Sequence, residues 1–322
     1  MSIERRTFLG SGIAMLATSA ASGQMVKRAN GSPEAPFFPP TERFPLWPRS
    51  APGAPRTVIR PNWTMDGELH IEGVPMPEVH VYRPARADGS AVMALPGGGY
   101  EYLSIQNEGL DPAERFNAER TTVFVLTYRL PGEGWQNRSL APIQDAQRAM
   151  RLIRSRAGDF HIDPARLGVL GFSAGGHLAA DLGVSFDQAI YKPVDEADSL
   201  SARPAFLGLI YAVTTLESGG HVGSRDTLLG TNAPAELVAA RSPVSHVTAA
   251  TPPSFVVAAF DDDTVPIANS LRWVDAAQRA KTSVEAHLFA QGGHGFGLHL
   301  PKENPGSRWP DLFALWMRQH GG

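Results

Sequence analysis

The chain contains no cysteine among its 322 residues. This absence excludes disulfide bonds, thiolate nucleophiles, cysteine metal ligands and lipid-modified cysteine. An excess of one charge is lacking too, because 29 basic and 32 acidic residues leave a formal net charge of −3. Such a balance gives no electrostatic reason to expect nucleic acid or an anionic membrane as a partner. The ten histidines lack the paired spacing typical of zinc sites, so we expect neither a metal nor a cofactor.

A long hydrophobic run is also missing. The N-terminal stretch IERRTFLGSGIAMLATSAASGQ begins with Arg5 and Arg6, and glycine and serine interrupt its apolar part. That part is shorter than the roughly 18 residues of a membrane-spanning helix. A cationic start, a short apolar run and small residues are typical of a secretory signal, and the paired arginines resemble the twin-arginine type. We predict a signal peptide over residues 1–23, export by the twin-arginine machinery to the periplasm or outside, and no stable membrane anchor. A frayed N-terminus is the alternative.

Prolines recur every few residues over GSPEAPFFPPTERFPLWPRSAPGAP. Proline lacks the amide that strand ladders need, so residues 24–56 are predicted to form an extended tether. Phe37, Phe38 and Trp47 are its candidate contacts with the following domain. From residue 57 to 322, β-rich runs alternate with helical runs, which predicts one α/β domain with a mostly parallel sheet and helices on both faces.

Individual segments support this α/β pattern. Residues 77–84 are expected to form an antiparallel strand, and the apolar runs within 90–95, 121–127, 166–172, 204–213, 254–260 and 283–290 further strands. One helix is predicted to begin with Asp111 as its cap, and RWPDLFALWMRQHG to form the last helix. A helix over 140–158 places Arg148, Arg151 and Arg154 on one face. We interpret this stripe as a solvated face paired with Asp145, rather than as a polyanion site.

The motif G-x-S-x-G occurs at residues 171–175, in RLGVLGFSAGGHLAADLG. It has chemical meaning only where a strand precedes it and a helix follows, and both are predicted here. In such an elbow the serine adopts sparsely allowed backbone angles and its hydroxyl stands above the sheet edge. Ser173 is therefore the candidate nucleophile. A small residue at an ordinary bend is the alternative.

A serine hydroxyl needs a base, and the base needs an orienting carboxylate. His294 follows the last predicted strand within AQGGHGFGLHL, whereas His299 lies in the next segment. Asp261, Asp262 and Asp263 end another strand. Asp262 is our choice for the acid, while Asp261 or Asp263, a solvated turn and a calcium loop are alternatives. The chain order Ser173, Asp262, His294 is that of the α/β-hydrolases.

The sequence LPGGGY follows the strand at 90–95. Bare glycine amides can approach a developing oxyanion, so Gly98, Gly99 and the amide of Ala174 are predicted to form the oxyanion hole. A plain glycine turn is the competing interpretation. Tyr100, Phe172, Tyr211 and Phe296 adjoin these motifs and are candidate substrate contacts or core aromatics.

From Val79 to Leu298 the chain resembles the α/β-hydrolase esterases related to acetyl xylan esterases, called BD-FAE-like. The matching blocks include LPGGGYEYLS, the pair Glu108-Gly109, LTYRLP, LAPIQDAQRAMRLIR, HIDPARLGVLGFSAGGHLAADLG, DDDTVPIANSL and GGHGFGL. The resemblance implies the α/β-hydrolase fold, a Ser-Asp-His triad and hydrolysis of carboxylic esters. We expect acetylated sugars or xylo-oligosaccharides as substrates, by family analogy. A peptidase of the prolyl-oligopeptidase type and a non-catalytic binding protein are the rival interpretations.

Overall fold

The computed structural model describes residues 39–320. The signal predicted over 1–23, together with Phe37 and Phe38, lies outside these residues. Within the described range, no helix is both long and apolar enough to cross a bilayer.

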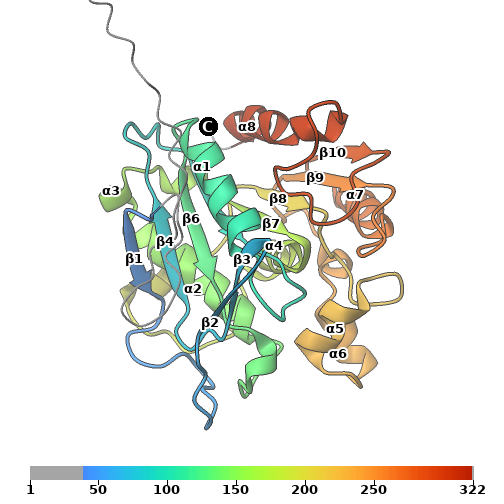
Figure 1. The fold of residues 1–322 in the computed structure, drawn as a ribbon. Helices are drawn as coiled ribbons and strands as arrows, with labels where there is room; N and C mark the ends of the chain where they lie inside the picture. Colours follow the sequence, from blue (N-terminus) through green and yellow to red (C-terminus); the bar gives the residue numbers. More distant parts are fainter. Residues whose placement is uncertain (1–38, 321–322) are drawn as a thin grey trace, which may run out of the picture. The chain divides into compact units, whose positions relative to one another are not determined.

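The elements alternate between strands and helices along the chain, as the sequence predicts (Figure 1). The strands are β1 (Glu42–Pro45), β2 (Asn62–Asp66), β3 (Glu68–Glu72), β4 (Glu78–Tyr82), β5 (Ala91–Leu95), β6 (Thr122–Thr127), β7 (Leu167–Phe172), β8 (Leu207–Ile210), β9 (Ser254–Ala259) and β10 (Val284–Phe289). The α-helices are α1 (Asp111–Asn117), α2 (Ala141–Ser155), α3 (Ala157–Phe160), α4 (Ser173–Ser185), α5 (Val222–Leu229), α6 (Ala235–Ala240), α7 (Ala268–Ala280) and α8 (Trp309–His320). A π-helical turn, η1 (Gln106–Leu110), leads directly into α1, and the 3₁₀ turns are η2 (Pro131–Glu133), η3 (Pro164–Arg166), η4 (Glu196–Ser199), η5 (Pro243–His246) and η6 (Pro305–Arg308).

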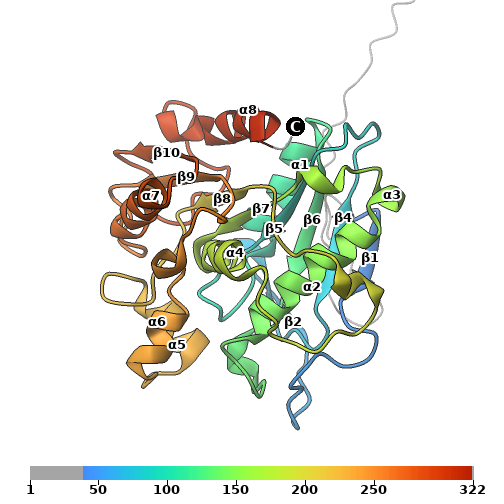
Figure 2. The same cartoon turned by 180° about the vertical axis from the view of Figure 1, so that it is seen from behind.

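Eight strands form one sheet in the order β1-β4-β6-β5-β7-β8-β9-β10. Of these strands, only β4 runs against its neighbours β1 and β6, and the other pairings are parallel. The five strands β5, β6, β7, β8 and β9 are buried along their whole length, which explains their continuously apolar sequences. Helices α1 and α8 cover one face, and α2, α4 and α7 cover the other (Figures 1 and 2). The predicted α/β architecture is confirmed.

The strand order reverses at β5 and β7, because β6 lies on the far side of β5 and the later strands lie beyond β7. Loops that leave neighbouring strands in opposite directions open a crevice at the carboxyl edge of a parallel sheet. The segments after β5, β7, β8, β9 and β10 all leave from this edge. They include the sequence motifs around Gly98, Ser173, Asp262 and His294.

The tether predicted over 24–56 is wrong for residues 42–45, which form strand β1, whereas the predicted contact of Trp47 with the domain is confirmed. Strand β1 pairs with β4 at the edge of the main sheet, and Trp47 is buried. The indole Nε1 of Trp47 donates to Asp145 Oδ1 at 2.8 Å. Asp145 in turn forms a fully buried ion pair with Arg129 at 2.8 Å. A buried carboxylate must be paired and hydrogen-bonded, and the indole of Trp47 supplies one of the hydrogen bonds that Asp145 needs. This contact joins the proline-rich segment to the domain.

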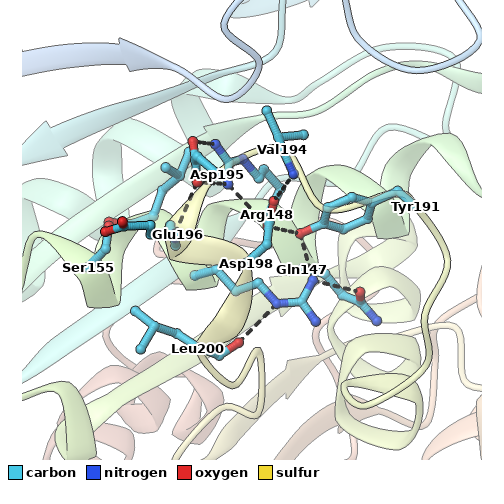
Figure 3. A network of polar contacts seen from close by, with 12 residues as sticks. Gln147, Arg148, Ser155, Tyr191, Val194, Asp195, Glu196, Asp198 and Leu200 are labelled. Atoms are coloured by element: carbon cyan, nitrogen blue, oxygen red, sulfur yellow. Dashed lines mark hydrogen bonds and ion pairs between the residues drawn. The ribbon is translucent and has the colours of Figure 1, made fainter.

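The arginine stripe of α2 is not a solvated face paired with Asp145. Arg148 is 1% exposed, and its guanidinium pairs with Asp195 and Asp198 (Figure 3). Arg151 donates to the hydroxyl of Tyr191 at 2.6 Å, and Arg154 donates to the carbonyl oxygens of Ser201 and Arg203. The stripe therefore anchors residues 191–203 to α2. A guanidinium can be buried when carboxylates and carbonyl oxygens use its donors.

The expected cap at Asp111 is also incorrect. Helix α1 continues directly from η1, so Leu110 occupies the cap position and makes no side-chain cap bond. The Asp111 carboxylate instead accepts a hydrogen bond from His299 Nε2 at 2.8 Å. His299 is thereby bonded on the surface and is separate from the carboxylate that contacts His294.

Candidate active site

Ser173 lies at the turn from β7 to α4, where φ is +51°. A non-glycine residue in this region is strained, and such strain persists only where the surrounding structure holds it. A Cβ atom at Gly171 would overlap the carbonyl oxygen of Gly175, and one at Gly175 would overlap that of Leu95. Both glycines of the motif are therefore sterically required, since the turn packs directly against β5 and its own first helical turn.

The side chains of Asp262, His294 and Ser173 form one hydrogen-bonded row, which we call the relay. His294 Nε2 lies 2.8 Å from Ser173 Oγ, and His294 Nδ1 lies 2.8 Å from Asp262 Oδ2. The carboxylate can only accept, so Nδ1 bears the proton and Nε2 presents its lone pair to the hydroxyl. This tautomer is the one that can take the serine proton. The structure therefore brings together three residues that are predicted from distant parts of the chain.

The three adjacent aspartates have different partners. Asp262 Oδ1 accepts from the amides of Thr264 at 2.9 Å and Val265 at 2.8 Å, which leaves Oδ2 for His294. Asp261 Oδ1 accepts from the amides of Gly292 and Gly293, both at 2.8 Å. Asp261 thus holds the two glycines that precede His294. We call residues 292–297 the histidine loop.

Residues 96–100, the oxyanion loop, lie beside Ser173. Gly98 and Gly99 have φ values of +116° and +63°, which glycine tolerates. A Cβ at Gly97 would lie 2.8 Å from Ser173 Cβ, so the backbone passes directly against the turn at Ser173. The amide of Ala174 belongs to the first turn of α4, where backbone N–H groups have no intrahelical acceptor. Gly98, Gly99, Ser173 and His294 thus converge on one spot.

A cavity of about 380 Å³ opens over this spot. Its lining is Glu68, Gly98, Gly99, Glu101, Tyr102, Ser104, Asn107, Glu108, Ser173, His221, Gly223, Thr264, His294 and Gly295. Three of these side chains are carboxylic acids, and none is lysine or arginine. No sequence motif indicates His221. Burial lowers the pKa of His221, so it faces the cavity as a neutral imidazole.

Glu108 is indicated in the sequence only through the family resemblance. It is 3% exposed, and burial raises its pKa to about 7. Its Oε2 accepts from the Gly97 amide at 2.6 Å, and its Oε1 accepts from the Tyr211 hydroxyl at 2.9 Å.

The four candidate aromatic contacts do not line the cavity. Tyr100 and Phe172 are 1% and 0% exposed, which corrects the expectation that they could contact substrate. Tyr100 donates to His177 Nδ1 at 2.7 Å, because His177 Nε2 donates to the carbonyl oxygen of Arg241, and Phe172 packs against Trp309. Tyr211 and Phe296 lie behind the site, where Tyr211 packs edge-on against both Phe296 and His294 at centroid distances of 4.6 and 5.0 Å.

The model of the BD-FAE family matches residues 79–276. The chain belongs to the BD-FAE family. This match spans the strands from β4 to β9, including the elbow and the Asp262 turn, and it confirms the resemblance drawn from the sequence blocks.

Named relatives come from two kinds of protein. An endo-1,4-beta-xylanase B of Butyrivibrio fibrisolvens is 33% identical over 204 residues, which are 63% of this chain and 32% of that protein. An acetylxylan esterase of Xylanibacter ruminicola is 29% identical over 244 residues, which are 74% of this chain and 44% of that protein. The chain therefore spans less than half the length of these curated relatives.

Solved structures place the chain among the α/β-hydrolases. An acetyl ester-xyloside bifunctional hydrolase of Caldicellulosiruptor lactoaceticus is 32% identical, with a TM-score of 0.74, over 88% of this chain and 98% of that chain. A carboxylesterase of Lactobacillus plantarum, at 24% identity and a TM-score of 0.63, covers 82% of this chain and 98% of its own, and it supports the fold alone.

Proposed function

We propose that the protein is a serine carboxylic-ester hydrolase that removes acetyl groups from sugars or xylo-oligosaccharides through an acyl-enzyme. The observation that carries this proposal is the relay itself, with 2.8 Å between His294 Nε2 and Ser173 Oγ beside the glycine amides of the oxyanion loop. Ser173 Oγ attacks the ester carbonyl while His294 takes its proton. Asp262 holds the imidazole in the required tautomer and stabilises the imidazolium that forms.

The negative charge that develops on the carbonyl oxygen needs donors near the nucleophile. The amides of Gly98, Gly99 and Ala174 are the proposed donors, because the Gly97 amide already donates to Glu108. Each donor of this kind is worth roughly 3 kcal/mol of barrier. His294 then protonates the departing alkoxide, and a water molecule repeats the sequence on the acyl-enzyme.

The cavity lining supports a neutral, hydroxyl-rich alcohol half. Glu68 and Glu101 can accept hydrogen bonds from sugar hydroxyls, Asn107 adds an amide group, and Tyr102 offers a ring beside them. With several carboxylates and no cationic side chain in this lining, an anionic substrate would meet like charge. The xylan-related names of the relatives from Butyrivibrio and Xylanibacter agree with this chemistry.

Localisation is part of the same proposal. Arg5 and Arg6 with the short apolar run that follows them support export by the twin-arginine machinery and removal of residues 1–23. A periplasmic or secreted esterase would meet acetylated plant polysaccharide outside the cytoplasm. Expression of the full chain with and without Arg5→Lys/Arg6→Lys, followed by cell fractionation, tests this part.

The catalytic proposal is tested with purified protein on p-nitrophenyl acetate, p-nitrophenyl butyrate, a peptide anilide and acetylated xylose beside acetylated glucuronate. We expect hydrolysis of the acetyl esters, preference for the neutral sugar and no anilide cleavage. Ser173→Ala should lower kcat by roughly 10⁶-fold. Ser185→Ala, in the same helix, is the matched control, because its hydroxyl bonds only within α4. Anilide cleavage would favour a peptidase, and a folded protein without activity would favour a binding protein.

A further inference from the structure

The π-helical turn η1 sends two consecutive side chains toward the two halves of the active site. Asn107 Nδ2 donates to the carbonyl oxygen of Gly295 in the histidine loop at 2.8 Å. Glu108 Oε2 accepts from the Gly97 amide, which lies at the start of the oxyanion loop. π-helical turns are rare and occur frequently at functional sites, because the added residue redirects side chains that an α-helix would place elsewhere.

Tyr211 connects the Glu108 carboxylate to the histidine loop. Its hydroxyl donates to Glu108 Oε1 at 2.9 Å and accepts from the Gly297 amide at 3.1 Å. Its φ of +37° is a strained value for tyrosine, and its ring packs edge-on against His294. An unbroken chain of hydrogen bonds thus runs from Gly97 through Glu108 and Tyr211 to Gly297.

We propose that Glu108 is a positioning residue, which acts through Tyr211 to hold the oxyanion loop and the histidine loop in the relative placement that ester hydrolysis needs. This inference rests on the proposed function. Glu108 has no role in proton transfer here, because its two oxygens are both occupied by donors and His294 Nε2 already faces Ser173.

The arrangement works only with the carboxylate form of Glu108. Both of its neighbours, the Gly97 amide and the Tyr211 hydroxyl, are donors, and the Tyr211 oxygen already accepts from Gly297. A proton on Glu108 would convert one acceptor into a donor. One of these groups would then be left unpaired in a buried site, where it lacks water to compensate for the lost hydrogen bond.

The groups facing Glu108 influence its ionisation in opposite directions. Burial raises its pKa most, to about 7, while His294 lowers the pKa and Glu68 raises it. Burial first, and then the carboxylate of Glu108, raise the pKa values of Tyr128 and Tyr102, so both stay neutral hydroxyls beside it. Near neutral pH, loss of the carboxylate form should therefore reduce turnover as the pH falls.

Three variants test the proposal with p-nitrophenyl acetate. Glu108→Gln places an NH₂ group opposite one of the two donors, so one of the two hydrogen bonds is lost. It should lower kcat by about 100-fold and change KM by less than about threefold, since small misplacements of catalytic groups have such effects. Tyr211→Phe keeps the ring against His294 and removes only the bridging hydroxyl, so it should lower kcat by a smaller factor. The double variant should be no slower than Glu108→Gln, because both changes break the same connection.

Glu133→Gln is the matched control. This half-buried carboxylate also accepts from a backbone amide, that of Val74, and from an aromatic donor, Trp135 Nε1, yet it contacts neither loop. It should keep wild-type kcat. On the acid side of the pH profile, the slope of log kcat against pH should exceed one for the wild type. Glu108→Gln should reduce that slope to one.

The outcomes separate this inference from the proposed function. Wild-type protein that hydrolyses the ester and loses this activity in Ser173→Ala supports the function. In that case a Glu108→Gln enzyme with wild-type kcat, or an acid limb unchanged in steepness, would overturn the positioning role alone. If Glu108→Gln fails to fold, an unchanged kcat in Tyr211→Phe would overturn that role instead. A wild-type protein without esterase activity would remove both proposals together.

Discussion

Replacement of Asp262 by asparagine tests the relay with a change of one atom. The two oxygens of Asp262 have distinct partners, since Oδ1 accepts from the amides of Thr264 and Val265 and Oδ2 accepts from His294. In Asp262→Asn, the amide oxygen should stay with the two backbone donors. The opposite orientation would lose two hydrogen bonds, each worth about 1 kcal/mol, and would place an NH₂ group against two N–H groups.

This preference turns the asparagine NH₂ toward His294. The imidazole must then accept at Nδ1 and bear its proton at Nε2, where that proton faces Ser173 Oγ. Such a ring cannot take the serine proton. We expect kcat at pH 7 to fall by roughly 10⁴-fold, or about 5.4 kcal/mol of barrier, with the fold unchanged.

The assay is p-nitrophenyl acetate hydrolysis, with Asp263→Asn as the matched control. Asp263 is exposed and accepts only from the Thr264 hydroxyl, at 3.2 Å, so its asparagine variant should remain within about twofold of wild type. The reasoning would be refuted if Asp262→Asn kept kcat within tenfold of wild type, or if Asp263→Asn were the slower enzyme.

Two further predictions concern the structure around the site. Gly175→Ala should destabilise the protein by about 3 kcal/mol or more and abolish activity, because its Cβ would overlap the carbonyl oxygens of Leu95 and Pro96. Gly158→Ala is the control. The new Cβ there has open space around it, so this variant should melt at the wild-type temperature. A Gly175→Ala protein that melts at the wild-type temperature would contradict the packing described here. Burial lowers the pKa of His177 to about 3, below its unfolded value near 6.5. Between these two values only the unfolded state binds a proton at this residue. The contribution of neutral His177 to the free energy of unfolding should therefore be fully present above pH 6.5 and be lost toward pH 3, by at most about 1.4 kcal/mol per pH unit. Guanidinium titrations at pH 7.5 and 5 should therefore show a smaller loss in His177→Gln than in wild type, and equal losses would refute this assignment.

Sequence reasoning succeeds where a local requirement identifies a residue. The elbow around Ser173 needs small neighbours at fixed spacing, and the glycines of the histidine loop mark a tight backbone after a strand. Because parallel strands end at one edge, residues that follow β7, β9 and β10 meet there even though they are distant in the chain. The order of the three catalytic candidates and the α/β architecture follow from such features.

Contacts between distant segments account for the elements and residues that the sequence did not reveal. Strand β1 is short and proline-flanked, and it exists only because β4 offers a free edge. Helical periodicity places Arg148 on the same face as Arg151 and Arg154, yet Asp195 and Asp198 neutralise it from a segment that follows α4. No periodic pattern encodes such a pairing.

Adjacency to a motif also does not give the direction of a side chain. Phe172 precedes Ser173, but alternation along β7 places its ring in the core against Trp309. The contacts of Glu108 depend on the π-helical turn and on two loops that approach from β5 and β8. Its neighbours in the sequence give no hint of either.

Trapping the acyl-enzyme tests the central claim most directly. Protein mixed with an excess of p-nitrophenyl acetate, quenched in acid within one turnover and digested, should yield a peptide acetylated at Ser173 in mass spectra. Ser173→Ala should give no acetyl-enzyme, and Asp262→Asn should form it far more slowly. An acetyl group on another residue, or full turnover by Ser173→Ala, would contradict the account.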